Sequence, residues 1–167
     1  MTDAIRSAIE GASAYLAEHP DEARYTDSLA TARVEDGLRI RVTGPNRETL
    51  VTDMPAAVGG AAAAPSPGWF LRASVAACVA SLAVMRAAAL GIEDFTCQVE
   101  VDSESDDRGI LGLDASVPGG PLSMRIAMRM SGAEAGRLQD VADWAVEHCP
   151  VSDAVRRAVP VSLQILS

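Results

Sequence analysis

The sequence has few cysteines, few histidines and no excess of basic residues. Its three cysteines are too few and too scattered to form a disulfide scaffold. Neither of its two histidines, His19 and His148, has a second histidine or a cysteine at metal-ligand spacing, so we expect no metal site. The net charge of −9 disfavours nucleic acid as a partner, because binding to phosphates requires a basic face.

Long apolar runs are also missing. The charge-free helical stretch 73–85 lies between two arginines and has thirteen residues, which is too short to span a bilayer and predicts a buried helix. The first ten residues carry charges and no apolar signal core. We therefore expect a soluble, cytoplasmic protein without a membrane partner, whose cysteines are reduced and whose disulfides, if any, are transient.

About half of the residues are apolar, which suits a single domain over residues 1–167. Helical spacing of apolar residues predicts helices at 3–18, 69–90, 133–147 and, after a Ser152 cap, 153–158. Alternation predicts strands at 38–42, 95–102, 122–130 and 159–165. The turn signal Asp36-Gly37 predicts a hairpin that pairs 38–42 with a strand at 25–34, and a second turn at 44–46 precedes a short strand at 48–52. Because strands and helices are grouped along the chain, the pattern indicates an α+β fold with largely antiparallel sheet.

Two segments flank the helix predicted at 69–90. Residues 55–68 are rich in Ala, Gly and Pro and are consistent with either a mobile linker or a lid beside a site. Ser66 is a suitable cap for the helix start, and Gly91 is a suitable stop at its end. The apolar residues on nearly every face of the helix predict that it is buried almost all round.

The three cysteines differ in their surroundings. Cys78 lies in the middle of the central helix among alanines, where a small core residue is one interpretation and a reactive thiol the other. Cys149 lies where one helix ends and another begins, a position that can stabilise a thiolate. Cys97 shares the apolar face of a strand and is expected to be a core residue. His148 precedes Cys149 and is either a base for it or simply exposed.

Two segments together resemble the OsmC/Ohr family, namely residues 65–78, PSPGWFLRASVAAC, and residues 148–155, HCPVSDAV. The family has a proline-initiated central helix with an Ala-Ala-Cys element and a later Cys-Pro-Val-Ser turn. The resemblance covers residues 25–166, and residues 1–20 form an N-terminal helical extension. It implies an OsmC-like α+β fold, in which mainly antiparallel sheets wrap around the long central helix in an intertwined homodimer.

The resemblance also implies a thiol-dependent organic hydroperoxide reductase. Cys78 would be the peroxidatic cysteine and Cys149 the resolving cysteine, through a disulfide between them. The substrate would be an organic hydroperoxide, and a dithiol reductant, in the family often a lipoylated protein, would reopen the disulfide. No metal or organic cofactor is implied.

The sequence departs from the family at the groups that activate the nucleophile. In the peroxidases an arginine, oriented by a glutamate that follows the helix-opening proline, favours the thiolate. Here Gly68 follows that proline, and Glu35 occupies the place where some members carry the arginine. Arg33, Arg41 and Arg47, from the sheet or from the other subunit, are alternatives.

Two other functions are consistent with the same residues. One is an OsmC-like protein that binds a small molecule without peroxidase turnover, in an apolar pocket near Gly68 and Trp69. The other is a redox sensor that uses Cys78 and Cys149 to alter a partner contact.

Overall fold

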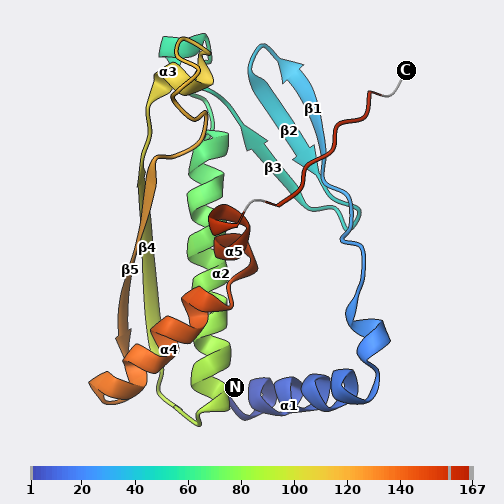
Figure 1. Ribbon diagram of the computed structural model, residues 1–167, viewed down its shortest axis with the longest axis vertical. Helices are drawn as coiled ribbons and strands as arrows, with labels where there is room; N and C mark the ends of the chain where they lie inside the picture. Colours follow the sequence, from blue (N-terminus) through green and yellow to red (C-terminus); the bar gives the residue numbers. More distant parts are fainter. Residues whose placement is uncertain (1, 158, 166–167) are drawn as a thin grey trace. The chain divides into compact units, whose positions relative to one another are not determined.

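The structure is a computed structural model that describes residues 2–157 and 159–165 (Figure 1). The fold is α+β, as predicted. The chain divides into two compact units, Glu10–Ala73 and Met1–Ile9 with Ser74–Ser167, which are described separately. The elements in chain order are α1 (Thr2–Glu18), η1 (Pro20–Ala23), β1 (Thr31–Asp36), β2 (Arg39–Thr43), β3 (Thr49–Thr52), η2 (Ala56–Val58), α2 (Pro67–Ala89), β4 (Thr96–Glu104), α3 (Asp107–Ile110), β5 (Ser123–Ser131), α4 (Ala135–Glu147) and α5 (Pro150–Arg156).

The unit Glu10–Ala73 contains a three-stranded antiparallel sheet in the order β1-β2-β3. Gly37 has a φ of 53° and forms the turn between β1 and β2, which confirms the predicted hairpin. The first strand begins at Thr31, later than predicted, and pairs in the register Ala32 with Val42. Residues 25–30 form no strand, because they extend beyond the end of β2 and have no ladder partner there.

The segment that joins β3 to α2 is held by one carboxylate. Asp53 is only 2% exposed. Its Oδ1 accepts hydrogen bonds from the N–H groups of Met54 (2.7 Å) and Ala61 (3.4 Å), and its Oδ2 accepts one from Ala63 (3.0 Å). These three bonds lower the pKa of Asp53, with the bond from Ala63 the largest cause, so the stabilisation is present at neutral pH and is lost as pH falls through the folded-state pKa. The segment is therefore a latched loop, not a featureless linker.

A glycine inside this loop gives a test of how tightly it is closed. A Cβ on Gly60 would lie 1.9 Å from the backbone oxygen of Met54. We expect Gly60→Ala to lower the free energy of unfolding by roughly 2 kcal/mol or more, because backbone must move. Gly11→Ala, in the open part of α1 with nothing within 4 Å, is the matched control and should stabilise by about 0.5–1 kcal/mol. Thermal unfolding followed by circular dichroism measures both, and equal midpoints would contradict a closed loop.

Helix α2 begins two residues before and ends one residue before the predicted bounds of 69–90, and it has the predicted cap and stop. The Oγ of Ser66 accepts a hydrogen bond from Trp69 N (3.2 Å), and Gly91, with a φ of 69°, ends the helix. The prediction that it is buried almost all round is wrong for this chain. Its buried residues form one stripe, Val75, Val79, Ala83, Ala87 and Ala88, because this chain covers only one face of it.

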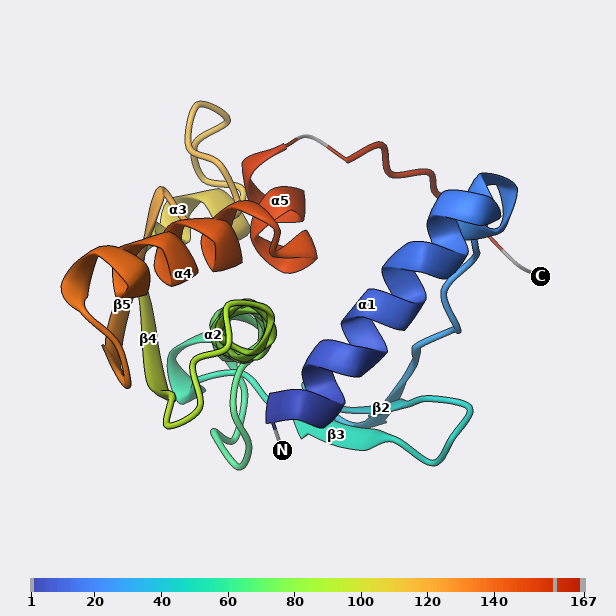
Figure 2. The ribbon, with the colours of Figure 1, turned by 90° about the horizontal axis from the view of Figure 1, so that it is seen from below.

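The covered face of α2 packs in the second unit against an antiparallel β4–β5 hairpin and against α4 (Figures 1 and 2). The two strands pair from Thr96 with Ser131 to Glu104 with Ser123, and their inward side chains alternate with exposed ones. Helix α4 contributes Val141 and Ala145 to the same core. This packing fixes the middle of α2, which contains Cys78, against the helices that follow.

Two predictions about the C-terminal region are wrong. The last helix begins at Pro150 and is capped by Cys149, not by Ser152. Residue 158, in the predicted range 153–158, lies outside the described residues. No strand forms at 159–165, because its backbone has no neighbouring strand within the described chain, and Val161, Leu163 and Ile165 are 88–93% exposed.

Helix α2 is longer than the thirteen-residue run from which the sequence predicted a helix too short to span a bilayer. The helix has 23 residues and is long and apolar enough, by length and composition alone, to cross a membrane. The charge-free run 73–85 is shorter because Arg72 and Arg86 bound it, and both arginines lie inside the helix. A core helix of a soluble protein satisfies the same criterion.

Candidate functional site

The two cysteines predicted to react are brought together, although 71 positions separate them in the chain. Cys78 is half-buried in α2, and Cys149 is fully buried at the start of α5, in the same apolar core. Both thiols are free, and they lie close enough for the Cys149 thiol to raise the pKa of Cys78. A disulfide between them requires such proximity.

The first turn of α5 directs backbone donors at both sulfurs. The Sγ of Cys149 accepts a hydrogen bond from Ser152 N (3.3 Å) and caps the helix. The N–H of Val151 acts on the sulfur of Cys78 and lowers its pKa. Pro150 has no N–H and occupies the first helical position, where none is needed. The helix begins at this point because Cys149 provides an acceptor at the N-cap position and Pro150 follows at the first helical position.

The surroundings keep the Cys78 thiol protonated. Burial is the largest cause that raises its pKa, and the hydrogen bond and the charge of Cys149 raise it further, whereas the Val151 N–H opposes them. No arginine contributes to this shift among the residues that the structure describes. A protonated thiol is a weak nucleophile, so within the described part of one chain the site lacks a cation that favours the thiolate.

The imidazole of His148 is held by two contacts with Trp144. Its Nδ1 lies 2.9 Å from the carbonyl oxygen of Trp144, and its ring stacks on the Trp144 indole at 4.3 Å between centroids. Arg86 extends this stack, with its guanidinium 5.6 Å from the indole centroid, and it forms an ion pair with Asp140 (2.9 Å). This arrangement favours the structural interpretation of His148, as a cap at the end of α4.

The family is decided by the match to known proteins. A family model described as OsmC-like protein matches residues 59–164, which is more than half of the chain and includes both cysteines. The chain belongs to the OsmC family. No protein of curated function shows a significant match to it.

Crystal structures of OsmC and Ohr proteins share the fold. An organic hydroperoxide resistance protein OsmC from Legionella pneumophila is 22% identical, with a TM-score of 0.57 over 80% of this chain and 91% of that one. An OsmC-like protein from Mycoplasma pneumoniae is 14% identical, with a TM-score of 0.68 over 81% and 91%. An organic hydroperoxide resistance protein from Elizabethkingia anophelis is 20% identical, with a TM-score of 0.58 over 81% and 91%. At these identities the likeness shows the fold alone.

The third cysteine of this OsmC-family chain is a core residue, as predicted. Cys97 lies on β4 opposite Met130 and packs against the core cluster. Burial alone raises its pKa. Cys97 is therefore a matched control for the other two cysteines, since it is a half-buried thiol whose pKa is shifted by burial and not by a second thiol or a helix start.

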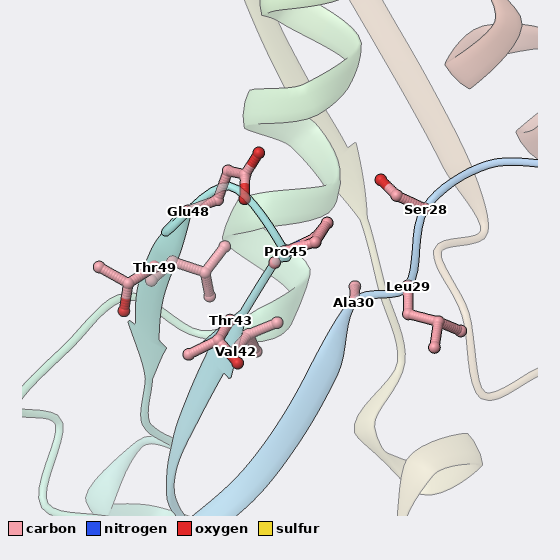
Figure 3. Close-up of a pocket in the computed structure, with 10 residues that line it drawn as sticks. Ser28, Leu29, Ala30, Val42, Thr43, Pro45, Glu48 and Thr49 are labelled. Atoms are coloured by element: carbon pink, nitrogen blue, oxygen red, sulfur yellow. The ribbon is translucent and has the colours of Figure 1, made fainter.

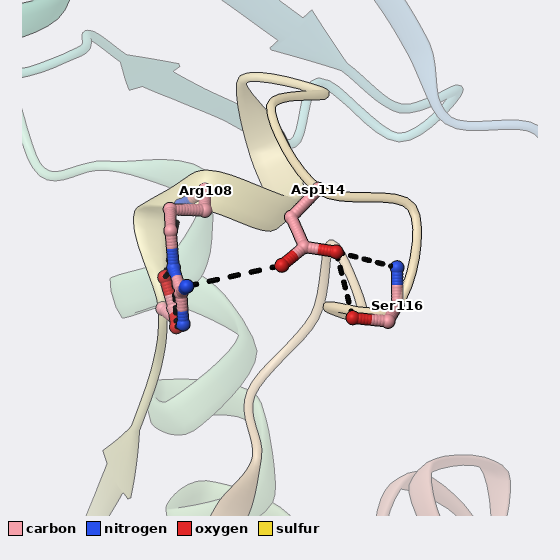
Figure 4. Close-up of polar contacts among 4 residues, drawn as sticks. Arg108, Asp114 and Ser116 are labelled. Carbon is pink, nitrogen blue, oxygen red and sulfur yellow. Dashed lines mark hydrogen bonds and ion pairs between the residues drawn. The ribbon is translucent and has the colours of Figure 1, made fainter.

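The acidic segment between β4 and β5 of this OsmC-family chain is a group of ion pairs without a thiol. In the acidic 103–120 loop, the Arg108 guanidinium pairs with Asp106 and, at 3.8 Å, with Asp114, whose carboxylate also accepts from Ser116 (Figure 4). The carboxylates of Asp106 and Asp114 are thus paired within the loop itself. No group of three or more potential ligands that could hold a metal ion occurs within residues 2–157 and 159–165.

A cavity of about 310 Å³ opens beside the β2–β3 turn (Figure 3). Its walls are mainly apolar, from Leu29, Val42, Pro45 and Leu50. Its one acidic group, Glu48, accepts hydrogen bonds from the backbone N–H (2.8 Å) and the side chain (3.1 Å) of Asn46. Among the described residues, its lining includes no cysteine, histidine or lysine.

Proposed function

We propose that the protein is a thiol-dependent organic hydroperoxide reductase with Cys78 as peroxidatic and Cys149 as resolving cysteine. The observation that supports this proposal is that the two thiols lie in the same core cluster beside the start of α5, where Cys149 raises the pKa of Cys78. Burial and packing alone would account for one cysteine in the core, but they do not require two sulfurs from distant segments to share one set of backbone donors.

The reaction follows from the positions of the two sulfurs. The Cys78 thiolate attacks the O–O bond, an S–O bond forms, and the leaving alkoxide takes a proton and departs as the alcohol. The Cys149 thiol then attacks the oxidised sulfur, an S–S bond forms, and the hydroxyl leaves as water. A dithiol reductant, for which a lipoylated protein is a candidate, reduces the disulfide by exchange and is itself oxidised to a disulfide.

Formation of the Cys78 thiolate needs a nearby cation, and none of the described residues of the same chain supplies one. We propose that a second copy of the chain supplies it. Of the three arginines considered from the sequence, Arg41 is oriented by a carboxylate, since its Nε contacts Glu35. Glu35 also accepts from Arg39 (3.1 Å), and these contacts lower its pKa. Arg41 is therefore the candidate activator, presented by the sheet of one copy to Cys78 of the other.

A homodimer also accounts for apolar surface that one chain leaves uncovered. Val84 and Met85 on α2 are 39% and 36% exposed. The alternating Val161, Leu163 and Ile165 are 88–93% exposed. Exposed apolar surface of this kind is typical of an interface. Sedimentation equilibrium should give a mass near twice 17.4 kDa. The cytoplasmic location of the protein stays a prediction.

Steady-state peroxide consumption tests the proposal. The full-length protein should consume tert-butyl hydroperoxide continuously when dihydrolipoamide is the reductant, because a dithiol reopens a disulfide efficiently by forming a ring. Consumption of about one equivalent followed by arrest, with the dithiol present, would contradict the reductase and favour a redox sensor.

Ligand binding without turnover is the second candidate, and the raised pKa of Cys78 favours it. The two candidates differ in the thiol titration of the assembled protein. A Cys78 pKa above the ordinary value in the homodimer, with no disulfide after peroxide treatment, would identify a binding protein.

A further inference from the structure

A second cavity, of about 450 Å³, lies within the unit Glu10–Ala73. One wall is the latched loop that follows β3, and the other is the first part of α2. Most of its lining is apolar. The lining residues are Asp53, Met54, Pro55, Ala62, Ala64, Pro65, Ser66, Trp69 and Arg72.

The loop wall is formed before any ligand arrives. The Asp53 carboxylate binds backbone N–H groups at Met54, Ala61 and Ala63, and the Asp53 N–H donates to the Pro65 oxygen (3.2 Å). Its oxygens are thus used inside the loop, and its side chain is almost fully buried. A preformed wall reduces the ordering cost of binding.

The helix wall presents a flat apolar surface and a cation. The indole of Trp69 is 48% exposed, with Phe70 against it edge to face at 5.1 Å between centroids. Arg72 lies one turn further along α2 from Gly68. A Cβ on Gly68 would have the Arg72 Nη1 at 3.9 Å, so the missing side chain leaves space directly beside this guanidinium.

We propose that this cavity binds an aromatic monocarboxylate. The ring lies against Trp69, Met54 and the proline rings, which suit a flat apolar group. The carboxylate receives the planar fork of Arg72, whose five N–H donors allow a two-bond contact besides its other interactions. A monoanion is favoured over a dianion, because the charge of Asp53 lies in the same lining.

This inference is independent of the peroxidase proposal, because no lining residue is a cysteine. The Cys78→Ser protein should bind the same ligand with unchanged affinity. If the wild-type protein binds the ligand but does not consume peroxide, only the peroxidase proposal fails. If it consumes peroxide but does not bind the ligand, only this inference fails.

Ligand-observed NMR or calorimetry on the full-length protein tests the inference with benzoate, benzyl alcohol and phthalate as probes. Benzoate should bind saturably and about tenfold or more tightly than the neutral alcohol or the dianion, since a charge-assisted pair is lost or opposed in those two. Absence of saturable benzoate binding up to about 10 mM, or equal binding of benzyl alcohol, would overturn the inference.

Substitution at Gly68 separates the role of Arg72 from general packing. In Gly68→Glu the new carboxylate lies four residues before Arg72 on α2 and competes with the ligand for its guanidinium. Benzoate affinity should fall about tenfold in Gly68→Glu and in Arg72→Gln, but less than about threefold in the neutral, similarly sized Gly68→Gln. Equal affinities of the glutamate and glutamine variants would overturn the assignment of Arg72, whether or not Arg72→Gln folds.

Discussion

Replacing Cys78 by serine is expected to reduce steady-state consumption of tert-butyl hydroperoxide by at least about a thousandfold, to the background rate of the dithiol. A serine hydroxyl at this position neither ionises near neutral pH nor forms a stable oxidised intermediate. The substitution removes one sulfur from a half-buried site and leaves the fold largely intact, because the buried stripe of α2 does not include this residue.

The control for this prediction is Cys97→Ser. Cys97 is also half-buried and also has a pKa raised by burial, but it contacts no second cysteine. Its replacement should leave the turnover rate within about twofold of that of the wild type. Comparable turnover by the Cys78→Ser protein and the wild type would exclude Cys78 as the nucleophile.

Replacing Cys149 by serine is expected to separate the first half of the reaction from the second. The Cys78 sulfenic acid should still form, but without a thiol beside it the steady rate should fall about a hundredfold. Serine is a favourable N-cap, so α5 keeps its capped first turn and the loss is one of chemistry. Rapid-quench trapping with a sulfenic-acid reagent measures the accumulated intermediate.

A steady rate that survives in Cys149→Ser would show that the reductant attacks the oxidised Cys78 directly. The sulfur-to-sulfur contact would then be a matter of packing only. The expected result is one equivalent of alcohol per site in a fast phase, followed by a slow phase whose rate depends on the dithiol concentration.

Much of the fold was predictable because local chemistry and tertiary packing agree. Strict alternation at 122–130 predicted β5 to within one residue at each end, and Ser66 and Gly91 bracketed α2 correctly. The hairpin turn at Gly37 was likewise specified locally, by a residue that tolerates positive φ.

The errors arose where the outcome depends on groups distant in sequence. The alternation at 159–165 predicted a strand, but a strand needs a neighbour with free N–H and C=O groups, which the described chain does not place beside it. The start of α5 was missed because serine is the commoner cap, whereas here the sulfur of Cys149 accepts the bond from Ser152. The role of Asp53 was also missed, since two of its three donors lie eight and ten residues later in the loop.

The candidate site was predictable as a pair of residues but not as an environment. The two cysteine motifs identified Cys78 and Cys149 without showing that they touch. The raised pKa of Cys78 follows from burial and from the neighbouring sulfur, and neither can be read from a sequence. In the homodimer that we propose, a guanidinium from the second copy reverses this shift.

Disulfide mapping after a single addition of organic hydroperoxide tests the central claim most directly. One equivalent of tert-butyl hydroperoxide per chain, followed by alkylation, proteolysis and mass spectrometry, should convert two thiols per chain into one disulfide. The account predicts that this disulfide joins the peptides containing Cys78 and Cys149, with Cys97 alkylated. Recovery of all three cysteines as free thiols, or a disulfide that includes Cys97, would contradict it.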